Sequence, residues 1–290
     1  MPNLDHIMPN PSVILILWGH DYVANPRTTK NLTQMFSDLI TGPFMNGLAQ
    51  YGIHRGSLAE PFVIDDHNPP AIITYRDTSN NLEDDITKFL RKWIAAGLIP
   101  PAAGDINTMY FIIPPRQTHI QTYNNASDPI GNGIQGFHNE GVTDPAISPP
   151  MFWAIARTDD ALDGSFGGDL SNAEARDGGL DFVGGVAGIP NGGVYGMATK
   201  VGHELVEQFA DRNGSFKELG DPCINTGIQY RGWALQQYWS EWDKSCINGD
   251  APVSLKKFLN AIGFNFTRGL ASLGSKTINI DYVASAMQSR

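Results

Sequence analysis

The first half of the chain alternates apolar runs with amphipathic segments, and this alternation restricts the possible folds more than any other feature of the sequence. Residues 12–18 form an almost uninterrupted apolar run, which is typical of a strand buried on both faces. Residues 28–39 then repeat apolar side chains at helical spacing, with Thr28 or Thr29 available as the N-cap and a Gly-Pro pair at the end. Strands that alternate with helices predict an α/β fold, in which helices cover a mostly parallel sheet.

Further apolar runs continue this pattern along the chain. They predict strands at residues 61–64, 109–113 and 151–156, and helices at residues 81–96, 197–211 and 254–262. Residues 278–287 are compatible with either a strand or a helix. Between these elements, residues 163–193 are rich in glycine but contain neither a P-loop nor a dinucleotide fingerprint, so phosphate binding has no support from the sequence.

The length of the chain fits one large domain. Its 290 residues can bury an apolar core without help from a metal ion or a disulfide. We expect a single domain over residues 1–290, in which a sheet and helix part at 1–211 is followed by a loop-rich part at 212–290.

The charge balance excludes some classes of partner. The formal net charge is −10 and the sequence has no cluster of lysine and arginine, which argues against nucleic acid and against an anionic membrane as partners.

The apolar run at 13–18 is much shorter than the roughly 20 residues of a membrane span, so no transmembrane helix is expected. The run is not a signal peptide, because no basic segment precedes it and no small-residue cleavage site follows it. We therefore expect either the mature form of an exported protein, which is favoured, or a cytoplasmic protein. The oligomeric state stays open.

The pentapeptide His203-Glu204-Leu205-Val206-Glu207, inside the helix expected at 197–211, is the strongest candidate for chemistry. Residues four apart share one face of a helix, so His203 and Glu207 can bind one metal ion, as the two histidines of His-Glu-x-x-His do. Glu204 then occupies the place of the general base that takes a proton from metal-bound water. The alternative is an ordinary solvated helix, in which Lys200 and Glu204 form an i,i+4 ion pair.

A catalytic zinc ion usually has three protein ligands and one open position, so a third ligand is required from outside the helix. Asp221 is our first choice, because Gly220 allows the chain to turn back beneath the helix, and Glu218 is the second. His138 and His20 are more distant candidates. Zinc is the expected ion, and another divalent metal is the alternative.

The segment 199–246, about a sixth of the chain, resembles the plant exordium (phosphate-induced) family and its bacterial and fungal relatives. These proteins carry a His-Glu-Leu-x-Glu helix, then Glu-x-Gly-Asp-x-Cys, then a hydrophobic segment with Tyr-Trp-Ser and a second cysteine. The matching residues here are His203, Glu204, Leu205, Glu207, Glu218, Gly220, Asp221, Cys223, Tyr238, Trp239, Ser240 and Cys246. The resemblance implies a zincin-like, more narrowly metzincin-like, core in which Glu207 replaces the second histidine. It implies no particular reaction.

The two cysteines and the aromatic residues near them have simple structural interpretations. A disulfide between Cys223 and Cys246 is favoured over two free thiols, and over Cys223 as a nucleophile. The neighbouring aromatic side chains could line a groove for carbohydrate or peptide, but core packing is favoured for them. They are Tyr230, Trp233, Tyr238, Trp239 and Trp242.

These features lead to three hypotheses for function. The first is a zinc-dependent hydrolase, a metallopeptidase or amidohydrolase, that uses metal-activated water on a peptide or small-molecule substrate. The second is a non-catalytic, secreted binding or signalling protein, in which a structural metal or a hydrogen-bonded cluster fixes the helix to the following loop. The third is a non-hydrolytic enzyme of small molecules on the same core.

Overall fold

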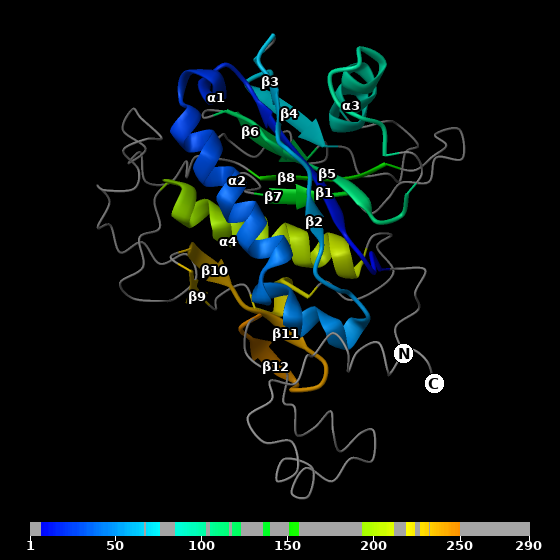
Figure 1. The fold of residues 1–290 in the computed structure, drawn as a ribbon, viewed down its shortest axis with the longest axis vertical. Coiled ribbons are helices and arrows are strands. Elements are labelled where there is room, and N and C mark those ends of the chain that lie inside the picture. Colours follow the sequence, from blue (N-terminus) through cyan, green and yellow to red (C-terminus); the bar gives the residue numbers. More distant parts are fainter. Residues whose placement is uncertain are drawn as a thin grey trace, which may run out of the picture.

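A six-stranded, mostly parallel sheet forms the centre of the protein in the computed structural model (Figure 1). The structure describes residues 7–66, 68–75, 85–102, 105–115, 118–122, 136–139, 151–156, 193–211, 219–223, 227–231 and 233–249. The strands of the sheet follow the order β2-β1-β5-β8-β7, and β3 also pairs with β1. Their bounds are β1 Ser12–Trp18, β2 Ser57–Leu58, β3 Phe62–Ile64, β5 Thr108–Ile113, β7 Gly136–His138 and β8 Phe152–Ala156. Only the edge strand β7 runs antiparallel to its neighbour, β8.

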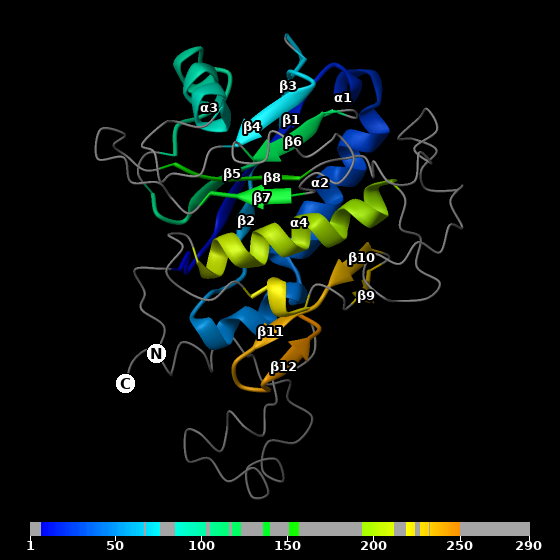
Figure 2. The same cartoon turned by 180° about the vertical axis from the view of Figure 1, so that it is seen from behind.

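Helices cover both faces of this sheet. The helices α2 (Pro26–Thr41) and α4 (Gly193–Ala210) lie on one side, and α3 (Asp85–Ala95) lies on the other (Figures 1 and 2). A separate parallel pair, β4 (Ile72–Tyr75) with β6 (His119–Thr122), accompanies α3. The short helices α1 (Asp21–Ala24) and η2 (Pro43–Tyr51) flank α2 in the sequence. The predicted α/β fold with a mostly parallel sheet is therefore confirmed.

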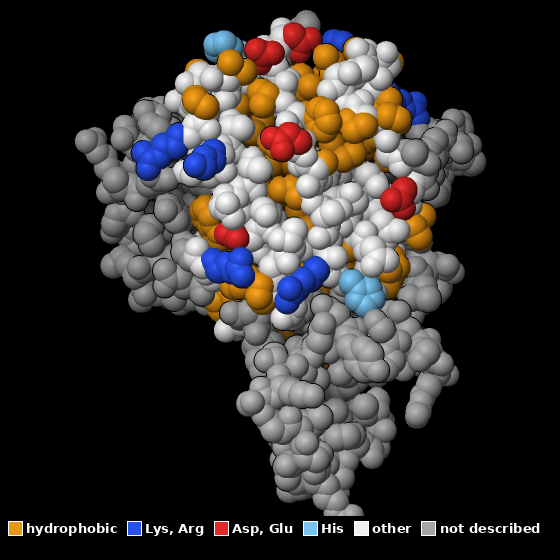
Figure 3. Space-filling view, in the orientation of Figure 1, with side chains coloured by type: hydrophobic (Ala, Val, Ile, Leu, Met, Phe, Trp, Pro, Cys, Tyr) orange, Lys and Arg blue, Asp and Glu red, His pale blue; other side chains and the backbone are white. Residues whose placement is uncertain are grey.

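Alternation along the strands produces two apolar cores. Leu15 and Leu17 of β1 belong to the core shared with α2 and α4, whereas Ile14 and Ile16 point into the core under α3. On the face shown in Figure 3, hydrophobic side chains gather over β3, β4 and α3, where Ile72 remains 39% exposed. The sheet is thus buried on both faces, as the continuous apolar run of β1 indicated. No helix among the described residues has both the length and the apolar character that a membrane crossing requires.

Several boundaries differ from the sequence prediction. The helix α2 begins at Pro26 with Asn25 as its N-cap and no capping side-chain hydrogen bond, so capping by Thr28 or Thr29 was wrong. Proline at the first helical position explains the early start, because its fixed φ already suits a helix. The strands β2, β4, β6 and β7, and the four short strands that follow α4, were missed, since two to four residues carry too little periodicity to be recognised alone. The predicted elements at 254–262 and 278–287, the glycine-rich residues 163–192 and the first four residues of the helix predicted at 81–96 lie outside the described residues.

The described C-terminal part forms a third layer beneath α4. Two hairpins lie on the opposite side of α4 from the sheet (Figures 1 and 2). They are β9 (Gly227–Tyr230) with β10 (Trp233–Gln236), and β11 (Tyr238–Ser240) with β12 (Ser245–Ile247). The helix α4 is consequently enclosed between the sheet and these hairpins, and residues on opposite sides of the helix can both be buried.

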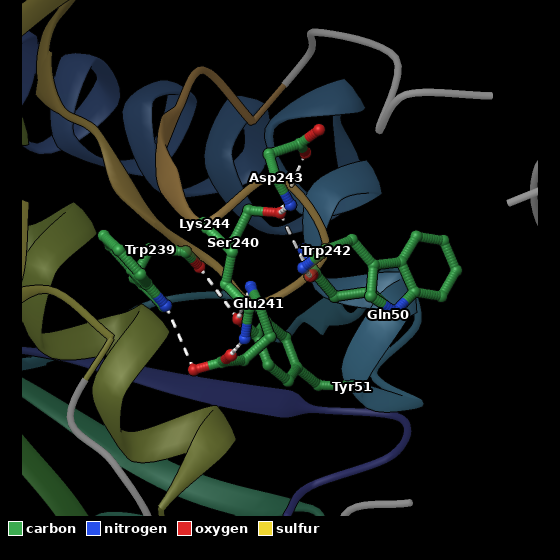
Figure 4. A network of polar contacts seen from close by, with 8 residues as sticks. All are labelled: Gln50, Tyr51, Trp239, Ser240, Glu241, Trp242, Asp243 and Lys244. Carbon is green, nitrogen blue, oxygen red and sulfur yellow. Dashed lines mark hydrogen bonds and ion pairs between the residues drawn. The ribbon is translucent and has the colours of Figure 1, made fainter. Parts of the chain in front are cut away.

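Polar contacts fix the second hairpin to the end of η2, as Figure 4 shows. The hydroxyl of Tyr51 donates to the carbonyl of Trp239 (2.9 Å) and accepts from the amide of Glu241 (2.9 Å). The amide oxygen of Gln50 accepts from the backbone N–H of Trp242 at 3.1 Å. Every one of these contacts joins residues about 190 positions apart, so the N-terminal half determines where the hairpin lies.

Replacing Tyr51 with phenylalanine tests this attachment. Tyr51→Phe leaves two partly buried backbone groups without their partner, so we expect the free energy of unfolding to fall by about 1–3 kcal/mol. Thr41→Val is the control, because that exposed hydroxyl donates to the carbonyl of Ser37 within the same helix, so its loss should cost less. Chemical denaturation of both variants gives the comparison, and equal losses would contradict the attachment.

Candidate metal centre

The helix α4 buries most of the pentapeptide rather than presenting it to solvent. Leu205 and Val206 pack in the core between α4, the sheet and the hairpins. Glu204 is 5% exposed and Glu207 is 2% exposed, although both are acidic. Buried carboxylates of this kind are rare unless they are paired or bind a metal. The solvated-helix interpretation of this motif is therefore wrong.

Three side chains that the sequence named as candidate metal ligands lie close together near the protein surface. The Nε2 atom of His203 lies 3.1 Å from Oε2 of Glu207 and 3.8 Å from Oδ1 of Asp221. One ligand atom from each residue lies within 4.8 Å of the others, which is close enough for a shared metal ion. The side chain of Asp221 is 58% exposed and that of His203 is 16% exposed, so solvent reaches the group from this side.

The loop that carries Asp221 is held against the helix by Glu207. The Oε1 atom of Glu207 accepts hydrogen bonds from the backbone N–H of Gly220 (3.1 Å) and of Asp221 (3.0 Å). The side-chain amide of Gln236 donates to the carbonyl of Gly220 at 2.6 Å. A disulfide between Cys223 and Cys246, as predicted, joins this loop to β12. Asp221 is thus fixed from the helix, from β10 and from the second hairpin.

A second group of ligand atoms lies deeper, between α4 and the edge strand β7. The Nδ1 atom of His138 is 2.9 Å from Oε2 of Glu204 and 3.7 Å from Oε2 of Glu207. All three residues are buried, and one ligand atom from each lies within 4.8 Å of the others. A Cβ on Gly136 would lie 2.5 Å from Oε1 of Glu204, so glycine allows β7 to approach the carboxylate this closely.

The neighbour of His138 fixes the end of β7. Asn139 accepts from the backbone N–H of Trp153 at 2.7 Å through its side-chain oxygen, and its side-chain amide donates to the carbonyl of Met151 at 2.8 Å. The antiparallel register of β7 and β8 places His138 opposite Ala154. The pairing of β7 with β8 therefore places the imidazole of His138 next to α4. Its position does not depend on the loop that carries Asp221.

Most residues named from the sequence are present in these two groups. His203, Glu207 and Asp221 lie together, and His138 contacts Glu204, which was expected to act as the base. Glu218 lies outside the described residues, and His20 belongs to neither group. Sequence reasoning missed the close contacts at Gly136 and Gly220, for which the signal was a glycine one or two residues before a candidate ligand. Three of the five aromatic side chains are buried, namely Tyr230, Trp233 and Tyr238.

Comparisons of the chain with models of protein families, with curated proteins and with solved structures found no match. The interpretation of the two groups therefore depends on their geometry and chemistry.

The imidazole of His203 is strongly influenced by its acidic neighbours. Burial lowers its pKa, but the hydrogen bond and charge of Glu207, together with the charges of Glu204 and Asp221, outweigh burial and raise the pKa to about 9. In the metal-free protein the imidazole is therefore protonated at neutral pH. A metal ion that binds its Nε2 atom has to displace this proton.

The affinity for a divalent ion should consequently increase with pH. Between about pH 7 and pH 9, the deprotonated fraction of His203 increases about tenfold per pH unit, and we expect the same increase in affinity. Above about pH 9 the affinity should level off. Competition with a chelator of known pH dependence measures the affinity for the divalent ion at each pH. An affinity that is constant between neutral pH and pH 9 would exclude His203 as a ligand.

Gly220 provides a test of the fit between loop and helix. A Cβ at this position would lie 2.5 Å from Nδ1 of His203 and 2.7 Å from Oε1 of Glu207, so Gly220→Ala should displace both side chains. We expect zinc affinity to fall at least about tenfold, which corresponds to roughly 1.4 kcal/mol. Gly202→Ala on the same helix is the control, because its Cβ would meet its nearest neighbour at 3.6 Å. This control should retain affinity and gain up to about 1 kcal/mol of stability; equal affinities of both variants would contradict the close fit.

Proposed function

We propose that this protein is a zinc-dependent hydrolase of peptide or amide bonds with a zincin-like core. The observation that carries the proposal is the convergence of one imidazole and two carboxylates, from His203, Glu207 and Asp221, beside a further carboxylate from Glu204. An imidazole nitrogen with carboxylate oxygens is a donor set that zinc accepts, and three protein ligands leave one position open. Because the side chain of Asp221 is exposed, a substrate could reach an ion held there from the solvent.

The chemistry of the donor set supports a metal ion at this point. The Nε2 atom of His203 faces Glu207, and its Nδ1 atom is buried without a hydrogen-bond partner among the described residues. The ring is held instead by the close approach of Gly220. Most zinc-bound histidines use their second nitrogen for a hydrogen bond, so here packing replaces the usual orienting partner.

Each residue then has a distinct task. An ion at this position supplies a lowered pKa for a water molecule and polarises a substrate carbonyl. Glu204 would be the base for that water, and His138 orients the carboxylate of Glu204 through the 2.9 Å contact. Glu207 and Asp221 together contribute two negative charges, which weaken zinc as a Lewis acid compared with a site of several imidazoles. A slow hydrolase, or one that uses another divalent metal, agrees with this donor set.

The proposal also includes membership of the exordium family and export from the cell, both of which the sequence suggested. The resemblance to the exordium family rests on the segment that contains the helix, the loop and the two cysteines. The disulfide between Cys223 and Cys246 supports an exported protein, because disulfides persist in oxidising compartments.

Glu204→Gln tests the enzymatic proposal. The amide cannot accept the proton, so we expect hydrolysis of a peptide mixture to fall about 10²- to 10⁴-fold while the zinc ion held by His203, Glu207 and Asp221 stays bound. Mass spectrometry of the peptide products and elemental analysis of the purified protein measure the two quantities. Glu60→Gln, on the exposed surface, is the control and should change neither.

One observation favours a second candidate, a binding or signalling protein in which the cluster has a structural role. Glu204 and Glu207 already have partners within the protein, from His138 and from the backbone of the loop. If the wild-type protein binds zinc but cleaves no peptide, and if removing zinc lowers the melting temperature, this candidate replaces the hydrolase.

A further inference from the structure

We propose that the cluster binds two divalent cations rather than one, with Glu207 as a carboxylate bridge between them. The first ion takes the position between His203, Glu207 and Asp221, which is that of the proposed function. The second takes the deeper position between His138, Glu204 and Glu207. The inference rests on the proposed function only for the first of these positions.

The distances within both groups fit the ligand spacing of a metal ion. Zinc with ligands about 2.0–2.1 Å away in a tetrahedron separates those ligands by about 3.3 Å. In the outer group, the contacts of His203 with Glu207 and Asp221 measure 3.1 and 3.8 Å. In the inner group, the contacts of His138 with Glu204 and Glu207 measure 2.9 and 3.7 Å. The two groups have nearly the same dimensions on either side of Glu207.

The carboxylate of Glu207 is arranged as a bridge. Its Oε1 atom is occupied by the backbone N–H groups of Gly220 and Asp221. Its Oε2 atom lies 3.1 Å from the imidazole of His203 and 3.7 Å from that of His138. A carboxylate oxygen has two lone pairs, so the same Oε2 atom can face one ion on each side.

The excess of carboxylates in the cluster favours a divalent cation. Two buried carboxylates, from Glu204 and Glu207, face the same Nδ1 atom of His138. Even with a proton on both His138 and His203, the cluster has two positive charges against the three carboxylates of Glu204, Glu207 and Asp221. A divalent ion faces both carboxylates at once. With two ions, four positive charges stand against the three carboxylates of the whole cluster.

The two positions are chemically equivalent in their ligands. Each ion receives one imidazole, one carboxylate of its own and the shared carboxylate of Glu207. Hydrolytic centres with two metals hold their ions about 3.5–4 Å apart, and there both ions stabilise the attacking and leaving oxygens. Glu204 would bind the inner ion through the Oε2 atom that faces His138, which leaves its Oε1 atom to act as the base of the proposed function.

Counting the bound ions tests the inference without reference to activity. The full chain is stripped with a chelator and titrated with zinc by calorimetry, and elemental analysis gives the ions per chain after gel filtration. We expect two ions for the wild type, one for His138→Gln and one for Asp221→Ala. Asp221→Ala removes an exposed side chain and keeps the backbone N–H that Glu207 requires, so this variant should remain folded.

Electron paramagnetic resonance of the manganese-loaded wild type keeps the test independent of variants that fail to fold. Two Mn²⁺ ions that share a carboxylate are spin-coupled, so the spectrum should lack the six-line signal of an isolated ion, and His138→Gln should restore that signal. One zinc ion per chain that Asp221→Ala removes, with no effect of His138→Gln, overturns the second position and leaves the proposed function intact. A single ion lost in both variants also overturns it. A chain that binds no ion overturns both proposals.

Discussion

The hydrogen bonds from the backbone of Gly220 and Asp221 to Oε1 of Glu207 are the interaction on which the candidate centre depends. They turn a carboxylate buried inside the protein into the attachment point of the loop after α4. Because they occupy one oxygen, they direct the other toward the imidazoles of His203 and His138. One side chain therefore determines both the path of the chain and the orientation of the ligands.

The layers around α4 make this arrangement possible. A helix that only packed on the sheet would bury one face and leave the acidic face in water. Here the hairpins cover the second face, and their contacts with η2 and the disulfide to Cys246 hold the loop of residues 219–223 in place. The edge strand β7 approaches from the sheet and brings His138. The cluster lies where these three layers meet, which explains why its carboxylates are buried and their neighbours are polar.

The sequence predicted the parts of this arrangement that depend on local periodicity. The spacing of His203 and Glu207 follows from helical geometry, and the loop through Asp221 lies close in sequence, so both were recognised. His138 could be named only as a distant candidate, because its approach requires the antiparallel pairing of a three-residue strand with β8. A strand this short shows no periodicity of its own. The early start of α2 was likewise hidden, since Pro26 acts through its fixed φ rather than through an apolar pattern.

The burial of the cluster also bears on why it exists. The two apolar cores on either face of the sheet are large enough to stabilise a chain of this size without ionisable groups in the interior. Burying carboxylates and imidazoles together is seldom better for stability than packing apolar side chains of similar volume, because desolvation offsets their attraction. A buried cluster of this kind, open to solvent at Asp221 and in part at His203, is a candidate for a functional site. Two imidazoles and three carboxylates are groups that could hold a divalent cation.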